Sequence, residues 1–382
     1  MSRQPAIVGV SESDLGVTGL DALTLLGQAV LGALADAGLT MSDVDGLAVN
    51  GVSRFSTAQV AEHLGIQPSW TDSTAAGGAS YELFVGHAAD AVRAGRAEVV
   101  VVAYGSDQRS SGSRTVGGVQ DESSPQFQFE VPYGPLFPIS LYAMAAQRYL
   151  HEYQAEMAQL AEVAVAAREW ARLNPVAYRY DAGGLTADDV VASPPISSPL
   201  RALDCCLVTD GGGAVVVTTL ERARDLKRQP VVVLGHGERT TSTSMSGVPD
   251  LLRTGAAGSA ETAFAMAGLT PADVDVAQVY DSFTITVLLS LEALGFCEYG
   301  EATSFIADGR TRPGGAFPLN TSGGGLSYTH PGMFGIFLLI EAVRQLRGEC
   351  GPRQVPSPEI AVAHGTGYLL STHGTVLLGV DR

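Results

Sequence analysis

The chain has 382 residues, 46% hydrophobic and 16% charged, so it can bury a large core and does not have the composition of a disordered protein. Its formal net charge of −17 argues against nucleic acid as a partner, because nucleic-acid binding depends on surfaces rich in lysine and arginine. No apolar run reaches the length of a membrane span, the N-terminus lacks the apolar stretch of a signal peptide, and the four cysteines show no disulfide or zinc spacing. We therefore expect a cytoplasmic protein without a membrane partner.

An internal repeat sets the expected architecture. In residues 33–50 ("ALADAGLTMSDVDGLAVN") an amphipathic helix ends at Gly38, a short helical turn begins at Thr40, and an apolar strand follows. Residues 263–280 ("AFAMAGLTPADVDVAQVY") repeat this order, with "AGLT" and "DVD" in the same register. The repeat predicts one α/β unit built twice around a pseudo-twofold axis.

Apolar strands accompany each copy of the repeat. Residues 88–107 ("AADAVRAGRAEVVVVAYGSD") read as a helix, a turn and a strand that is buried on both faces. We expect an N-terminal half over residues 1–230 and a C-terminal half over residues 231–382. Residues 108–200 look like an insertion, Ser/Gly-rich at first and helical afterwards, which we expect to form a loop domain or lid over a binding site.

The segment "SGGGLSYTHPG" (322–332) places Tyr328 and His330 directly after three glycines. Glycines let a backbone approach a ligand closely, so the pair could serve proton transfer, but an ordinary loop with two polar residues fits equally well. Two other chemistries find no support: the single lysine, Lys227, lies in a charged connector and is badly placed for a Schiff base, and the seven histidines show no metal-ligand spacing. We expect no catalytic metal.

Several blocks together carry a family resemblance. They are "LNPVAY" (173–178), "ISSPLRALDCCLVTDGGGAVVVT" (196–218), "YDSF" (280–283), "LEALGFCEYG" (291–300) and "SGGGLSYTHPG". With the duplicated half, they resemble the thiolase superfamily, and most of all its sterol-carrier-protein-x branch and the related lipid-transfer-protein type of steroid side-chain-cleaving aldolase. The resemblance implies the thiolase fold: two duplicated α/β halves in a layered αβαβα arrangement, with an inserted loop domain.

The departures from a true thiolase point to another reaction. Thr74 stands where the match places the cysteine nucleophile, and the C-terminal block "AHGTGYLLSTHG" (363–374) has no second cysteine, so an acyl-enzyme is not expected. Tyr280 begins the block that starts with histidine in sterol-carrier-type thiolases, and Tyr328 lies in the block that keeps His330. This combination resembles the aldolases, which cleave a β-hydroxyacyl-CoA by a retro-aldol reaction.

The resemblance also implies roles for these residues. Tyr280 or Tyr328 would take the hydroxyl proton and the other would protonate the enolate, an order that the sequence leaves open, while His330 would donate to the thioester oxygen. Taken alone, Tyr280 and His330 are each more typical of structural residues, whereas their combination with the loss of both cysteines favours catalysis. The substrate-binding positions carried over from the family are the backbone of Thr74 and of Gly367, as oxyanion donors, and Tyr368 as a wall of the pocket.

The resemblance implies a steroid 17-hydroxy-20-carboxyl-CoA as substrate, cleaved to a 17-ketosteroid resembling androstenedione and to propionyl-CoA. The residues themselves do not indicate the size of the substrate, and a shorter branched acyl chain fits them equally well. No cofactor is expected beyond the CoA that the substrate carries. The family implies a homodimer and a complex with a small OB-fold/zinc-ribbon protein that binds acyl-CoA. Two alternatives stay open: a non-catalytic thiolase-like subunit that binds acyl-CoA or scaffolds a partner, and an acyltransferase.

Overall fold

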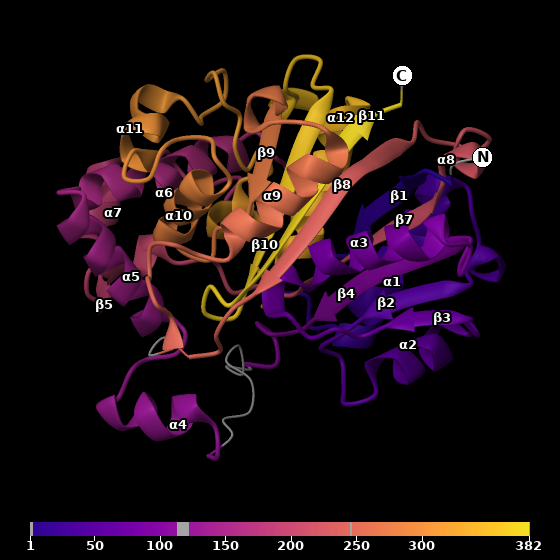
Figure 1. Cartoon of the computed structure of the whole chain (residues 1–382), viewed down its shortest axis with the longest axis horizontal. Coiled ribbons are helices and arrows are strands. Elements are labelled where there is room, and N and C mark those ends of the chain that lie inside the picture. The colour runs from indigo at the N-terminus through magenta and orange to yellow at the C-terminus, as the bar shows by residue number, and fades with distance from the viewer. Residues whose placement is uncertain (1–2, 113–121, 245–246, 382) are drawn as a thin grey trace.

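The computed structural model describes residues 3–112, 122–244 and 247–381 (Figure 1). Within these residues, nine strands form one mixed sheet in the order β3-β2-β4-β7-β1-β8-β11-β10-β9. The strands are β1 (Pro5–Glu12), β2 (Gly46–Val49), β3 (Trp70–Asp72), β4 (Val99–Ser106), β7 (Gly211–Thr219), β8 (Val231–Thr240), β9 (Val276–Val279), β10 (Ile360–Gly367) and β11 (Thr372–Val380). The first five belong to the N-terminal half and the other four to the C-terminal half.

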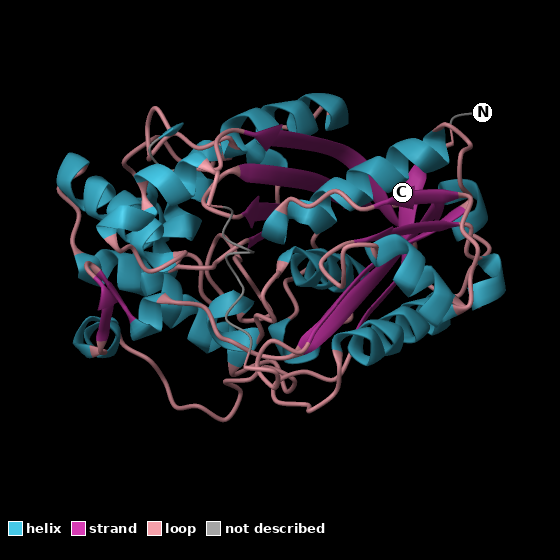
Figure 2. Ribbon diagram, turned by 90° about the horizontal axis from the view of Figure 1, so that it is seen from below, coloured by secondary structure: helices cyan, strands magenta, loops and turns pink. Residues whose placement is uncertain are grey.

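The two halves are joined where β1 meets β8 through only two residue pairs, Ala6 with Val232 and Ile7 with Val231. On either side of this seam the pairing is extensive, with β1 antiparallel to β7 and β8 antiparallel to β11. Such a short connection lets each half twist as its own sheet, and Figure 2 shows the strands of the two halves running in different directions.

The helices complete a layered arrangement. They are α1 (Ala22–Ala37), α2 (Ser56–Leu64), α3 (Ser80–Arg93), α8 (Leu220–Ala223), α9 (Ala256–Ala267), α10 (Thr284–Ala293), α11 (Ala302–Ile306) and α12 (Gly335–Arg347). Helices α3 and α12 contact strands of both halves and one another, whereas α1 packs on the N-terminal strands and α9 on β8 and β11. The buried apolar residues divide accordingly into three large clusters, one centred on α3 and α12 and two on the outer layers. The predicted αβαβα fold is confirmed.

The predicted repeat is also visible in its local structure. Helix α1 ends at Gly38, with a φ of 78°, and α9 ends at Gly268, with a φ of 66°; this left-handed backbone favours glycine. In each copy a threonine then begins a short 3₁₀ turn. The backbone N–H groups of Thr40 and Thr270 donate to Asp43 and Asp273, at 2.9 and 2.7 Å. Equal capping chemistry at both sites therefore produces equal supersecondary structure.

The insertion forms a helical layer beside the C-terminal half. Its described elements are α4 (Pro125–Phe129), α5 (Ile139–Glu152), α6 (Met157–Ala171), α7 (Ala187–Ala192), β5 (Pro195–Ser197) and β6 (Leu200–Arg201). Helices α5 and α6 pack against α10, while α4 projects from the body of the molecule (Figure 1). Part of the Ser/Gly-rich stretch, residues 113–121, lies outside the described residues. Among the helices that the structure describes, none has the length and apolar character needed to cross a membrane.

Candidate active site

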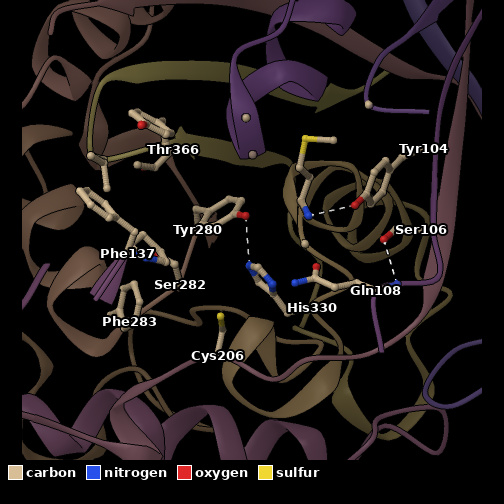
Figure 3. Close-up of a pocket in the computed structure, with 18 of the residues that line it drawn as sticks. Tyr104, Ser106, Gln108, Phe137, Cys206, Tyr280, Ser282, Phe283, His330 and Thr366 are labelled. Carbon is tan, nitrogen blue, oxygen red and sulfur yellow. Dashed lines mark hydrogen bonds between the residues drawn. The ribbon is translucent and has the colours of Figure 1, made fainter. Parts of the chain in front are cut away.

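A cavity of about 420 Å³ is lined by residues of both halves and of the insertion (Figure 3). The turn before α3, the end of β4 and the start of α5 each provide part of the wall. The segment after β9 contributes Tyr280, and the loop before α12 contributes His330. The cavity therefore collects blocks of sequence that lie far apart along the chain, which is typical of a substrate site in an α/β enzyme.

Tyr280 and His330 meet inside this cavity. The Tyr280 hydroxyl and His330 Nε2 are 3.1 Å apart, and the two rings lie edge to face at 90° (Figure 3). The Phe334 backbone N–H donates to the same hydroxyl at 3.1 Å, and the Phe334 ring stacks on His330. We assign the phenol as the donor, because its O–H needs an acceptor and Nε2 lies within reach; the hydrogen of a neutral imidazole then resides on Nδ1.

Burial keeps both groups neutral. Tyr280 is 4% exposed and His330 5%. Burial raises the pKa of Tyr280 well above its ordinary value of 10 and lowers the pKa of His330 to about 4. At neutral pH the pair consequently consists of a phenol and an imidazole that share one hydrogen bond, and a proton can pass along that bond in either direction.

Gly78, in the turn before α3, makes room for the phenol. A Cβ atom at this position would lie 2.3 Å from Tyr280 Cε2 and 2.5 Å from its hydroxyl oxygen, far inside normal contact distance. Gly78 lines the cavity, whereas Thr74 is exposed, and its N–H and hydroxyl bond to Asp72 at 2.9 and 2.8 Å. The residue at the start of the buried helix and beside the cavity is thus Gly78, and the structure does not bring Thr74 to the site.

The glycines before Tyr328 accommodate a carboxyl group. Asp281 is fully buried and accepts hydrogen bonds from the N–H groups of Gly325 and Leu326, at 2.7 and 3.1 Å. A Cβ at Gly324 would lie 2.1 Å from Asp281 Oδ2, and Gly324 has a φ of 62°. Burial raises the pKa of Asp281 to about 7 despite these bonds. Asp281 thereby fixes the loop that carries His330.

The structure separates the other predicted site residues. Tyr328 does not line the cavity. Its ring packs edge-on against Phe337, and burial raises its pKa well above 10. Gly367 packs against the turn before α3, where a Cβ would lie 1.7 Å from a backbone oxygen, and it does not line the cavity. Tyr368 does line it, and its hydroxyl hydrogen-bonds to Gln126 in the insertion. Only Tyr280, His330 and Tyr368 of the six predicted residues therefore share the cavity.

Two further tyrosines of the cavity wall were missed by the sequence analysis. The Tyr104 hydroxyl donates to the carbonyl of Pro331 at 2.5 Å and accepts from the Met333 N–H at 3.2 Å, so it holds the segment just after His330 (Figure 3). Tyr142 donates to the carbonyl of Tyr368 at 2.8 Å. A tyrosine near the end of the apolar run "VVVVAYG" is a weak local signal, and no sequence pattern indicates what its hydroxyl contacts.

Cys206 is the only cysteine that lines this cavity among the described residues. Burial raises the pKa of its thiol, which leaves little thiolate for nucleophilic attack. In the described part of the chain, no group of three His, Cys, Asp or Glu side chains is placed to hold a metal ion. The lack of a catalytic metal stays a prediction.

Comparison with known proteins places this chain in a family. The family described as "Thiolase C-terminal domain-like" matches residues 237–380. The chain is 40% identical over 99% of its length to the whole of a 17-hydroxy-3-oxo-4-pregnene-20-carboxyl-CoA lyase of Mycobacterium tuberculosis. The chain belongs to the thiolase superfamily. It is also 38% identical, over 99% of its length and 98% of the relative's, to a steroid side-chain-cleaving aldolase of Thermomonospora curvata.

A solved structure of this superfamily, named "Ltp2-ChsH2(DUF35) aldolase", superimposes with a TM-score of 0.90 at 35% identity. The match covers 100% of this chain and 98% of that one. Superfamily membership and resemblance to the steroid side-chain-cleaving aldolases, both expected from the sequence, are confirmed.

Proposed function

We propose that this chain is a carbon–carbon lyase that cleaves a β-hydroxyacyl-CoA by a retro-aldol reaction. The observation that carries the proposal is the neutral Tyr280–His330 pair, whose phenol occupies the space beside α3 that a side chain at Gly78 would otherwise fill. Full-length relatives named as a lyase and as an aldolase support the same reaction class. By analogy with the first of them, the substrate is a steroid 17-hydroxy-20-carboxyl-CoA.

The pair can act first as base and then as acid. The Tyr280 oxygen takes the substrate's hydroxyl proton while its own proton passes to His330 Nε2. The bond between the α- and β-carbons breaks, the former alcohol carbon becomes a ketone, and the electron pair remains on the thioester enolate. The proton then returns through Tyr280 to the α-carbon, so a 17-ketosteroid and propionyl-CoA leave without a net change in proton count.

The enolate needs stabilisation while the Tyr280–His330 pair holds the proton taken from the substrate. Gly77 and Gly78 line the cavity at the N-terminal end of α3, where the helix dipole is positive and backbone N–H groups are unused by the helix. We place the thioester oxygen at this turn. This chemistry requires no lysine adduct, and Lys227 lies at the surface beside Gly38.

Incubation with a β-hydroxyacyl-CoA tests the proposal. We expect a ketone and a shortened acyl-CoA in equal amounts, no requirement for free CoA, and a loss of turnover by orders of magnitude in Tyr280→Phe with folding intact. Saturable binding without products would instead identify a non-catalytic subunit. An acyl group trapped on Cys206 would identify an acyltransferase.

For the assembly we propose a cytoplasmic homodimer that pairs with a DUF35-type partner containing an OB fold. The solved relative named as an Ltp2-ChsH2(DUF35) aldolase supports the second association, and the four free cysteines fit a reducing compartment. Light scattering of the purified chain, with and without a co-expressed DUF35 protein, measures both associations.

A further inference from the structure

A second cavity, of about 240 Å³, adjoins the first, and Cys206 lines both. Its walls come from α6, from the loop that follows α6, from residues 202–203 and 205–208, and from Leu326 and Ser327. Ser327 precedes His330 by three residues, and the backbone N–H of Arg179 donates to the Ser327 carbonyl at 3.1 Å. The second cavity is therefore tied directly to the loop that positions the reacting imidazole.

Three arginines line this second cavity, and none of its described lining residues is acidic. Arg168 is only 8% exposed, and its guanidinium makes long hydrogen bonds, 3.4 Å to the Ser327 hydroxyl and 3.3 Å to the Gly183 carbonyl. Arg179 Nε is buried without a hydrogen-bond partner. The third, Arg109, is exposed at the rim. None of the three forms an ion pair within the described residues.

Such an arrangement is costly without a ligand. A buried guanidinium that lacks a carboxylate partner loses its hydration, and the two long hydrogen bonds of Arg168 replace only part of it. Burial, together with the charges of Arg179 and Arg172, lowers the pKa of Arg168. In a chain with a net charge of −17, an uncompensated cluster of cations is an exception. An anion that accepts several N–H donors at once would offset the cost, and phosphate oxygens match the planar donors of arginine.

We propose that this second cavity binds phosphate groups of the substrate's CoA portion, with the thioester reaching the first cavity past Cys206. The inference rests on the proposed function, since it supplies the other end of the same substrate. Apolar side chains between the arginines and Cys206, among them Leu203 and Leu326, suit the uncharged chain that links phosphates to thioester. Anchoring the phosphates beside Ser327 would hold the thioester at a fixed distance from His330.

Binding can be measured without turnover. Calorimetric titration of CoA and of inorganic pyrophosphate into the full-length protein should show both ligands binding. We expect Arg168→Gln and Arg179→Gln each to weaken CoA binding at least about tenfold, because each removes charge-assisted hydrogen bonds. The matched control is Arg172→Gln, an exposed arginine close to Arg168 that does not line the cavity. It should bind CoA as tightly as the parent.

Kinetics separate this site from the reaction centre. With the CoA thioester, the Arg168 and Arg179 variants should show a higher KM and an unchanged kcat. With the N-acetylcysteamine thioester of the same acyl group, which carries no phosphate, they should match the parent in both constants. Melting temperatures show whether each variant folds. Arg168→Gln removes a buried charge that has no ion-pair partner, so it should melt no lower than the parent. Arg179 is half-buried, and Arg179→Gln therefore provides a second, independent test.

The inference is overturned if both variants bind CoA as tightly as the parent, or if pyrophosphate binds and CoA does not. Failure of the proposed function looks different. The chain would then cleave neither thioester, while CoA binding would still depend on Arg168 and Arg179.

Discussion

The close contact between Gly78 and Tyr280 predicts that Gly78→Ala disables the site. The new Cβ would lie 2.3 Å from the phenol ring, where about 3.5 Å is normal, so the ring must move by about 1 Å. That shift would lengthen the 3.1 Å contact with His330 to about 4 Å, beyond hydrogen-bond range. Gly78 is not one of the chain's positive-φ glycines, so the backbone itself accepts alanine. The effect should come from the contact alone.

A displacement of about 1 Å at a reacting group typically costs about 10²-fold in kcat, and overpacking costs about 1–3 kcal/mol of stability. Steady-state cleavage of a β-hydroxyacyl-CoA measures the first, and urea unfolding the second. Gly213→Ala is the matched control: its Cβ would lie 2.9 Å from Ile336 and Ile340 side-chain atoms, and Gly213 does not line the cavity. It should lose stability but keep kcat. Full activity in Gly78→Ala, or an equal loss in Gly213→Ala, would refute the reasoning.

Three further outcomes follow from the electrostatics. Because the imidazole of His330 must be neutral to accept a proton and its pKa is about 4, kcat/KM should stay flat from about pH 9 down to about pH 6 and fall as pH approaches 4; a fall centred near 6.5 would contradict this. Glu341→Gln should lower the unfolding free energy by about 3 kcal/mol in urea titrations, because it leaves Arg353 buried without its 3.0 Å carboxylate partner. The hydrogen bond to Asp72 raises the pKa of His87 in the folded protein. The His87–Asp72 pair therefore contributes up to about 1 kcal/mol to the free energy of unfolding below about pH 6.5, and this contribution declines as the pH rises through the pKa of His87 in the folded state. The Tm difference between parent and His87→Gln should accordingly shrink between pH 6 and pH 9.

The fold could be predicted because its signals are local. The caps at Thr40 and Thr270 require only residues a few positions apart, and the glycine that ends each helix is determined by backbone conformation. Uninterrupted apolar runs such as 99–103 reveal strands buried on both faces without any knowledge of their neighbours. Two copies of one such unit then predict the layered architecture.

The candidate site was predictable only in part, because its geometry depends on long-range contacts. Tyr280 and His330 could be chosen because each stands in a recognisable block, and the structure brings them together. Tyr328 stands in the same block as His330, yet its side chain packs toward Phe337. Gly78 had no signal of its own, since its importance depends on a ring that lies 202 positions away in the chain. Matching by sequence blocks selected Thr74, which does not line the cavity, and overlooked Gly78, which does.

The neutrality of the buried pair follows from the reaction that we propose. A retro-aldol cleavage moves one proton from an oxygen to a carbon of the same substrate, so the enzyme must accept and then return a single proton and need not keep a permanent charge. Burial makes a stored charge expensive, as the raised pKa of the Cys206 thiol in the same cavity shows. A phenol and an imidazole that share one hydrogen bond carry no charge at rest, and the imidazolium exists only while the negative enolate beside it offsets its charge. The burial that makes a thiolate nucleophile unfavourable here is thus the condition under which the Tyr280–His330 pair works.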